Sequence, residues 1–280
     1  SYIFLFIFAY TQNAFGIAIQ SLIYRLVSNK IINKFASAKT YIETCDKYFL
    51  FVFIPSIVLI IAGWYWGIFI APPDAVQGDS YRIIYLHVPS SIYAQLIYWI
   101  MAAWSAIYLI WKVKLAAYLT KSAAFVGLLV TFLALFSGSV WGIPTWGTWW
   151  QWDARITSTL ILFLMYLGLI ALHDSFNNQN KADNLMSILT IVGCVNLPII
   201  KKSVDWWSTL HQPASITLTD NPAIDPAMLY PLILCIVSFG FVLISMGVLV
   251  SKIIIFNREK NRNWVKSYGC LFYTSPSPRD

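Results

Sequence analysis

Two histidines and one tryptophan-rich segment are the parts of this 280-residue sequence whose residue types and spacing could do chemistry. The segment Trp141–Arg155 reads WGIPTWGTWWQWDAR and carries five tryptophans within twelve residues. Indole faces offer wide apolar contact area and stack on π-systems, so the segment favours a platform for a large, flat, apolar ligand. Asp153 and Arg155 lie beside it, and a guanidinium there suits ligand carboxylates, which it grips bidentately. Anchoring at lipid headgroups is the alternative role for these indoles.

The two histidines flank the tryptophan segment in the sequence. His87 lies in YRIIYLHVPSS, preceded by Arg82, and His211 lies in WWSTLHQPAS. An isolated histidine is most often a polar loop residue. Two neutral imidazoles at opposite sides of a flat ligand are, however, what axial haem ligation requires. The third histidine, His173, is followed by Asp174 and is predicted to cap a helix C-terminus or lie in an inner loop.

The elements that position these residues must be membrane helices. The sequence is 59% hydrophobic and 11% charged, whereas a soluble domain has about 25% charged residues. This composition excludes an ordinary soluble enzyme and a disordered chain. Backbone groups in lipid must be satisfied internally, so we predict an all-α, polytopic membrane protein with six transmembrane helices and a Trp-rich outer-face loop. The charge-free runs that predict the helices are 48–71, 88–111, 122–140, 156–172, 185–200 and 227–251.

The tryptophan segment contains two glycines and one proline. Gly142, Pro144 and Gly147 make one regular helix across it an unfavourable prediction. Residues 148–152 are expected to form one or two turns along the bilayer surface. His87 and His211 are both expected on loops.

Charge predicts the orientation. Six spans put both termini on one side, where 15 of the 19 lysines and arginines fall, against 4 on the other side. By the positive-inside rule the termini are cytoplasmic, or matrix-side in a mitochondrion. The net charge of +7 therefore reflects topology and does not indicate nucleic-acid binding. Both flanking histidines and the tryptophan segment fall on the outer side, whereas the inner loops carry no comparable cluster.

The sequence predicts three parts of the chain. Residues 1–47 form an N-terminal region, 48–251 the six-span domain, and 252–280 a cytoplasmic tail. Residues 1–24 are apolar and charge-free, and they fit an extra span, a signal-like segment or upstream readthrough. Residues 270–280 resemble translated vector sequence, so neither end is given functional weight. The four cysteines are scattered without a C-x-x-C pair, which gives no zinc, iron–sulfur or disulfide framework.

The pattern WGxxxWGTWWxWDAR resembles the "WWD" signature of haem-handling membrane proteins. With the two histidine segments and six spans, residues 48–251 are similar to the cytochrome c maturation haem-delivery family CcmC (haem exporter protein C). The resemblance implies that His87 and His211 are axial ligands of a transient, non-covalent haem b. It implies that Arg82 and Arg155 meet the propionates. The platform and acceptor zone that it implies consist of Trp141, Trp146, Trp149, Trp150, Trp152 and Asp153.

The resemblance also implies a place of action and partners. Such a protein lies in the inner membrane and delivers haem to the periplasmic haem chaperone CcmE during c-type cytochrome maturation. The ABC-type pair CcmA/CcmB and the small subunit CcmD are its expected partners. Neither a nucleophile–base pair nor a nucleotide loop is present, so the chain is not expected to be an enzyme.

Two other functions stay open. A membrane b-type cytochrome passing electrons would place its histidines inside the bundle. A haem or solute permease would show ionisable groups within its spans, and the six runs hold only polar groups there, such as Gln95 and Asn196. The sequence leaves open whether the membrane is bacterial or mitochondrial.

Overall fold

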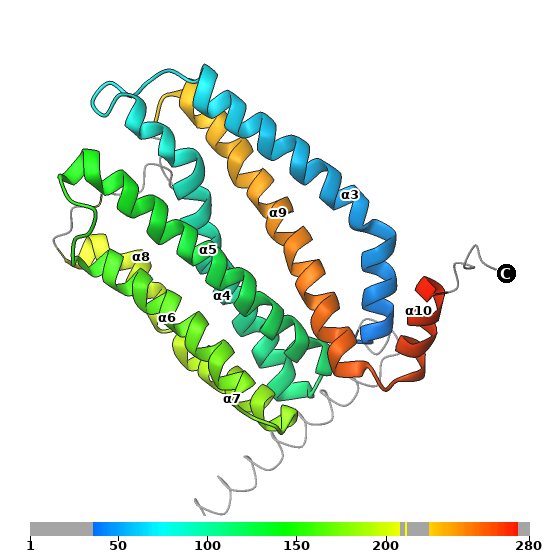
Figure 1. Cartoon of the computed structure of the whole chain (residues 1–280). Helices are drawn as coiled ribbons and strands as arrows, with labels where there is room; N and C mark the ends of the chain where they lie inside the picture. Colours follow the sequence, from blue (N-terminus) through cyan, green and yellow to red (C-terminus); the bar gives the residue numbers. More distant parts are fainter. Residues whose placement is uncertain (1–35, 208–210, 212–223, 274–280) are drawn as a thin grey trace, which may run out of the picture.

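The computed structural model describes residues 36–207, 211 and 224–273, and those residues contain helices and no β-strand (Figure 1). Residues 1–24, for which an extra span is one prediction, lie outside the described residues. Residues 274–280 of the vector-like end lie outside them too.

Six helical segments within the described residues are long and apolar enough to cross a membrane. This finding confirms the predicted fold class. Most of these helices extend beyond the charge-free runs, because charged side chains at helix ends reach toward water. A short helix, α10 (Asn263–Tyr273), follows the sixth span. The six segments are α3 (Ala38–Tyr65) with η1 (Trp66–Ile70), η2 (Asp79–Ile83) with α4 (Ile84–Trp111), α5 (Lys114–Trp146), α6 (Ala154–Asp174), α7 (Gln179–Gly193) with α8 (Asn196–Trp206), and α9 (Pro226–Glu259).

The helices begin and end at residues with clear local reasons. Asp153 and Asp225 cap α6 and α9 by accepting from backbone N–H groups of the first turn, and Pro226 occupies the first position of α9, where its missing N–H costs nothing. Gly147 ends α5 with φ +73°, a left-handed conformation that glycine adopts without strain.

The fifth span is broken. It is the shortest predicted run, and α7 ends at Gly193 before α8 begins at Asn196. The Asn196 side-chain amide donates to the Ser158 carbonyl of α6 at 2.9 Å. A Cβ at Gly193 would lie 2.1 Å from the Tyr98 hydroxyl, so only glycine allows α4 to pack so closely at the break.

The helices pack as two groups that lie side by side (Figure 1). Helix α3 packs mainly on α9, whereas α4 and α5 form the centre of the other group with α6, α7 and α8 around them. The main core lies between α4, α5, α6 and α7, where Tyr98, Met101, Leu162 and Tyr166 are fully buried. The α5–α6 connection, the N-terminus of α4 and the C-terminus of α8 lie at one end of the bundle, called the tryptophan end below.

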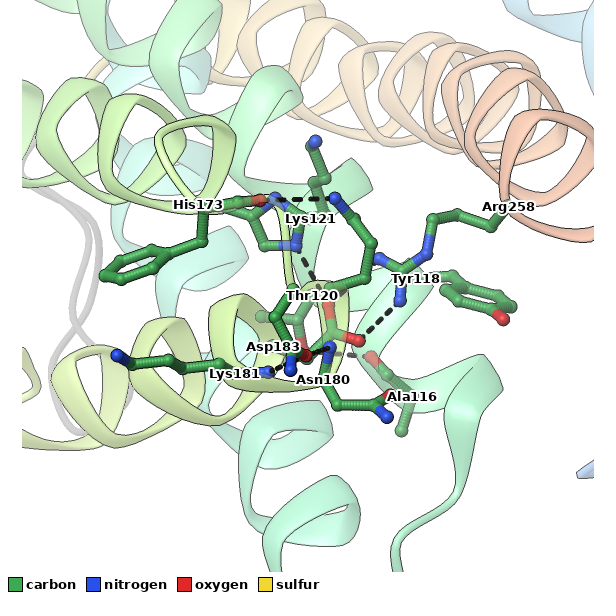
Figure 2. Close-up of polar contacts among 12 residues, drawn as sticks. Ala116, Tyr118, Thr120, Lys121, His173, Asn180, Lys181, Asp183 and Arg258 are labelled. Atoms are coloured by element: carbon green, nitrogen blue, oxygen red, sulfur yellow. Dashed lines mark hydrogen bonds and ion pairs between the residues drawn. The ribbon is translucent and has the colours of Figure 1, made fainter.

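The opposite end, called the basic end below, holds a buried polar cluster that sequence reasoning missed (Figure 2). Asp183 of α7 accepts from both terminal nitrogens of Arg258 in α9, at 3.1 and 2.6 Å. It also lies 2.9 Å from His173 Nε2 of α6. Lys121 of α5 pairs with Asp174 at 2.5 Å. His173 is 1% exposed, so its role is an interhelical contact and goes beyond the predicted cap.

Candidate functional site

The last two turns of α5 form the centre of the tryptophan end. The helix continues through Gly142 and Pro144 and ends at Trp146, with Gly147 as its C-cap, and α6 begins only at Ala154. The prediction that no single regular helix runs across the segment is confirmed, and the break lies at Gly147. Pro144 is tolerated within α5 because it removes only one N–H bond near a helix end. Residues 148–152 contain no helical turn, which corrects the expected surface turns. Trp141 and Trp146 therefore project from a helix, and only the other three tryptophans of the segment lie on the loop.

His87 lies in the first turns of α4, packed against α5. This position corrects the expectation of a loop histidine, since α4 begins at Ile84. Its Nδ1 lies 3.0 Å from the Ser137 hydroxyl, and its ring meets Trp141 edge-on at 5.6 Å between centroids. Gly138 makes this approach possible, because a Cβ there would be 2.8 Å from His87 Cε1.

His211, which follows the tryptophan segment in the sequence, contacts the same end of α5. Its Nδ1 lies 3.1 Å from Asp153 Oδ2, and its ring packs on Trp146 at 4.8 Å. The second oxygen of Asp153 accepts from the Ile156 N–H at 2.7 Å and so caps α6. One buried carboxylate therefore ties the start of α6 to His211.

The structure places the two histidines against the same end of α5. Each imidazole packs on a tryptophan from the last two turns of α5, Trp141 for His87 and Trp146 for His211. The pKa of His211 is lowered, mainly because burial disfavours the charged imidazolium, while the nearby Asp153 carboxylate partly opposes the shift. A neutral imidazole is the form that binds a metal ion.

The two arginines have different surroundings. Arg82 donates to the carbonyls of Gly67 and Ala71, at 3.1 and 2.7 Å, and pairs with Asp79 at 2.8 Å. The Arg82 guanidinium therefore stabilises the C-terminal end of η1 by hydrogen bonds to its carbonyls. Arg155 is half-buried at the start of α6, and its guanidinium has no hydrogen bond or ion pair among the described residues. The carboxylates of Asp153 and Asp205 lie near enough to act on this guanidinium electrostatically, but neither forms an ion pair with it.

The other tryptophans of the segment form an indole surface on the loop that follows α5. Trp149 and Trp152 are 65% and 73% exposed, and Trp150 lies between them with ring centroids at 5.9 and 5.4 Å. The buried Trp150 indole N–H has no hydrogen-bond partner within the described part of the chain. Such a surface suits an apolar, planar ligand.

These residues fit a haem as cargo. Among the described residues no group of three His, Cys, Asp or Glu side chains is placed to hold a bare metal ion. Two imidazoles suffice when the other ligands come from a porphyrin, since haem iron needs only axial ligands from the protein. The indoles match the porphyrin face, and the guanidinium of Arg155 matches a propionate.

Three residues of the site escaped sequence reasoning. Ser137 and Gly138 hold the His87 ring, and the Gln77 side chain accepts from the Trp141 indole at 2.8 Å. For Ser137 a signal exists: it lies one helical turn before Trp141, on the same face of α5. Gln77 comes from a separate segment, and only the tertiary structure shows its contact.

The fold and this site define a class: helical membrane proteins of six spans with two histidines and an indole surface at one end of the bundle. A family model for haem exporter protein C (CcmC) matches residues 31–266, and the chain belongs to this family. The haem exporter protein C of Escherichia coli K12 is 43% identical over 238 residues, 84% of this chain and 95% of the relative.

Other relatives are similarly close. The haem exporter protein C of Haemophilus influenzae is 42% identical over 239 residues, 85% of this chain and 97% of its own length. A ccmC-like mitochondrial protein of cytochrome c biosynthesis from Marchantia polymorpha is 45% identical over 177 residues, 63% of this chain and 75% of the relative.

Proposed function

We propose that this chain binds haem at the tryptophan end of its bundle and hands it on during c-type cytochrome maturation. The carrying observation is that His87 and His211, far apart in the sequence, pack on neighbouring turns of one helix. Family membership supports the role, since the relatives are named haem exporter protein C. We propose haem b, bound without a covalent link, with His87 and His211 as axial ligands.

The remaining site residues receive roles from their contacts. Trp141 and Trp146 orient the two imidazoles, and Trp149, Trp150 and Trp152 provide the apolar surface for the porphyrin and its acceptor. Arg155 is the propionate contact, because its guanidinium has no hydrogen bond or ion pair among the described residues. Arg82, which sequence reasoning assigned to a propionate, instead positions the end of η1 through its carbonyl contacts.

The position of the site residues at the tryptophan end supports delivery of haem to an acceptor outside the membrane. The tryptophan end faces the outer side of the inner membrane, because the basic residues collect at the other end. An acceptor in that compartment can reach the exposed indoles, and the chaperone CcmE is the acceptor we propose, with CcmA, CcmB and CcmD as partners. The protein supplies position and electrostatics and acts as a carrier, not as an enzyme.

Optical spectra of the full-length protein, purified in detergent with its haem, test the ligation. We expect His87→Ala and His211→Ala each to lose the six-coordinate, low-spin spectrum, and the matching glycine variants to regain it with added imidazole. His173→Gln, at the basic end, is the matched control and should keep the spectrum. Unchanged spectra in both alanine variants would show that these histidines are not the ligands.

Two further comparisons test the rest of the proposal. Arg155→Gln should lower haem content, whereas Arg82→Gln should keep most of it and instead raise hydrogen exchange in residues 66–83. Co-expression with the chaperone should yield covalently haem-loaded chaperone with the wild-type chain and little with His211→Ala. Equal loading by both would contradict delivery through this site.

A further inference from the structure

The Nδ1 atoms of the two histidines have different hydrogen-bond partners. His211 Nδ1 contacts a carboxylate oxygen of Asp153 at 3.1 Å, and His87 Nδ1 contacts the Ser137 hydroxyl at 3.0 Å. In both rings the contact is made by Nδ1. Nε2 is then the nitrogen through which each ring would bind iron.

The chemistry of the two partners favours one tautomer for each ring. A carboxylate only accepts, so His211 Nδ1 carries the hydrogen. The Ser137 hydroxyl donates to the Leu133 carbonyl at 2.6 Å, which leaves its lone pair to accept from His87 Nδ1–H. A neutral imidazole protonated at Nδ1 keeps its lone pair on Nε2. His87 Nε2 lies 3.4 Å from the Ser91 hydroxyl, a contact that iron would replace.

The two partners differ in strength. A hydrogen bond to an ionised acceptor is about twice as strong as one between neutral groups, and such a partner raises the basicity of a ligating histidine. The difference is not screened by water, because Ser137 is 1% exposed and the Asp153 side chain 6%. Asp153 is further held by its cap on α6.

We propose that Asp153 and Ser137 are positioning residues that make the two axial bonds unequal, with His211 the stronger ligand and His87 the one that leaves first. The inference rests on the proposed function. When the iron–His87 bond breaks, its electron pair stays on Nε2, and the haem is held by His211 with one axial position open to an acceptor. No electron is transferred in this step, and Ser91 can again donate to Nε2.

Reduction potentials and EPR spectra of the haem-loaded full-length protein test the unequal bonds. Asp153→Asn keeps an N-cap for α6 while removing the charge, so we expect a higher reduction potential and shifted low-spin g-values. Ser137→Ala should shift both much less. The matched control is Asp225→Asn, which makes the same change at the N-cap of α9 (Asp225 Oδ1 to Ala227 N, 2.7 Å) and should shift neither. Equal potentials in Asp153→Asn and wild type would overturn the proposal.

Haem release gives a second readout that does not depend on the Asp153 variant folding. Transfer to an excess of haem-free myoglobin should be at least about tenfold faster from His211→Ala than from His87→Ala, the size expected for a change around a metal ligand. Equal release rates with altered spectra in both variants would leave the ligation intact and refute the asymmetry. Spectra unchanged in both variants would instead refute the proposed function.

Discussion

Gly138 is the residue that lets His87 lie against α5. In Gly138→Ala the new Cβ would meet His87 Cε1 at 2.8 Å, closer than carbon atoms normally approach, so the ring must move away from Ser137. We expect a clear loss of haem per protein, measured by the pyridine haemochrome assay. Gly168→Ala in α6 is the control, because a Cβ there meets nothing within 4 Å. Full haem content in Gly138→Ala would mean that the ring position is not required.

His211 makes the stability of the apo-protein depend on pH. Its pKa is lowered in the folded state, and that of a histidine in an unfolded chain is about 6.5. As pH falls through about 6.5, the unfolded chain takes up a proton that the folded chain does not, so the free energy of unfolding decreases. Thermal unfolding in detergent between pH 7.5 and 5.5 should show this decrease. His211→Gln should flatten it, and an identical slope in the variant would rule His211 out as its source.

At the scale of helices, the buried Asp183 joins α6, α7 and α9 at the basic end. Asp183→Ala would leave Arg258 partly buried without its carboxylate and remove the partner of His173 Nε2. Breaking a buried pair in this way costs about 3–5 kcal/mol. We expect a large drop in thermal stability with an unchanged haem spectrum in the protein that remains folded.

An exposed ion pair supplies the control for Asp183. Lys39 and Glu43, 56% and 54% exposed, lie 3.7 Å apart on α3, and Glu43→Gln should cost less than about 1 kcal/mol. If both variants lowered the melting temperature equally, burial would not be the reason for the effect. If Asp183→Ala changed the haem spectrum, the two ends of the bundle would be coupled.

For the whole molecule, the orientation of the bundle is the property that decides, under the proposed function, which compartment would receive haem. Val76, 93% exposed, lies at the tryptophan end, and the exposed Asn261 follows α9 at the basic end. A membrane-impermeant thiol reagent on intact spheroplasts should label Val76→Cys, whereas Asn261→Cys should react only after lysis. The unsubstituted chain, with its four cysteines, gives the background. The reverse labelling pattern would invert the proposed orientation.

Sequence reasoning predicted the six spans but not how they end or break. The spans follow from apolar composition alone, because a helix in lipid needs a continuous apolar run whatever its neighbours are. Glycine and proline predicted that no single helix crosses residues 141–155, but not that the break lies at Gly147, after Pro144 in the last turn of α5. His173 was predicted to be a cap or an inner-loop residue, because its contact with Asp183 depends on how α6 and α7 pack together. Arg258, which pairs with Asp183, lies far away in the sequence.

The amino-acid sequence by itself determined the membrane fold and the kinds of side chain at the site: two histidines, a set of indoles and an arginine near them. Only the tertiary structure shows that Ser137 and Asp153 contact the two histidines, that Trp141 and Trp146 pack on their rings, and that Arg82 donates to carbonyls at the end of η1. The reason is physical. Helices that are apolar on every side carry little information about which face meets which neighbour, so rotation and pairing are set by packing between distant segments.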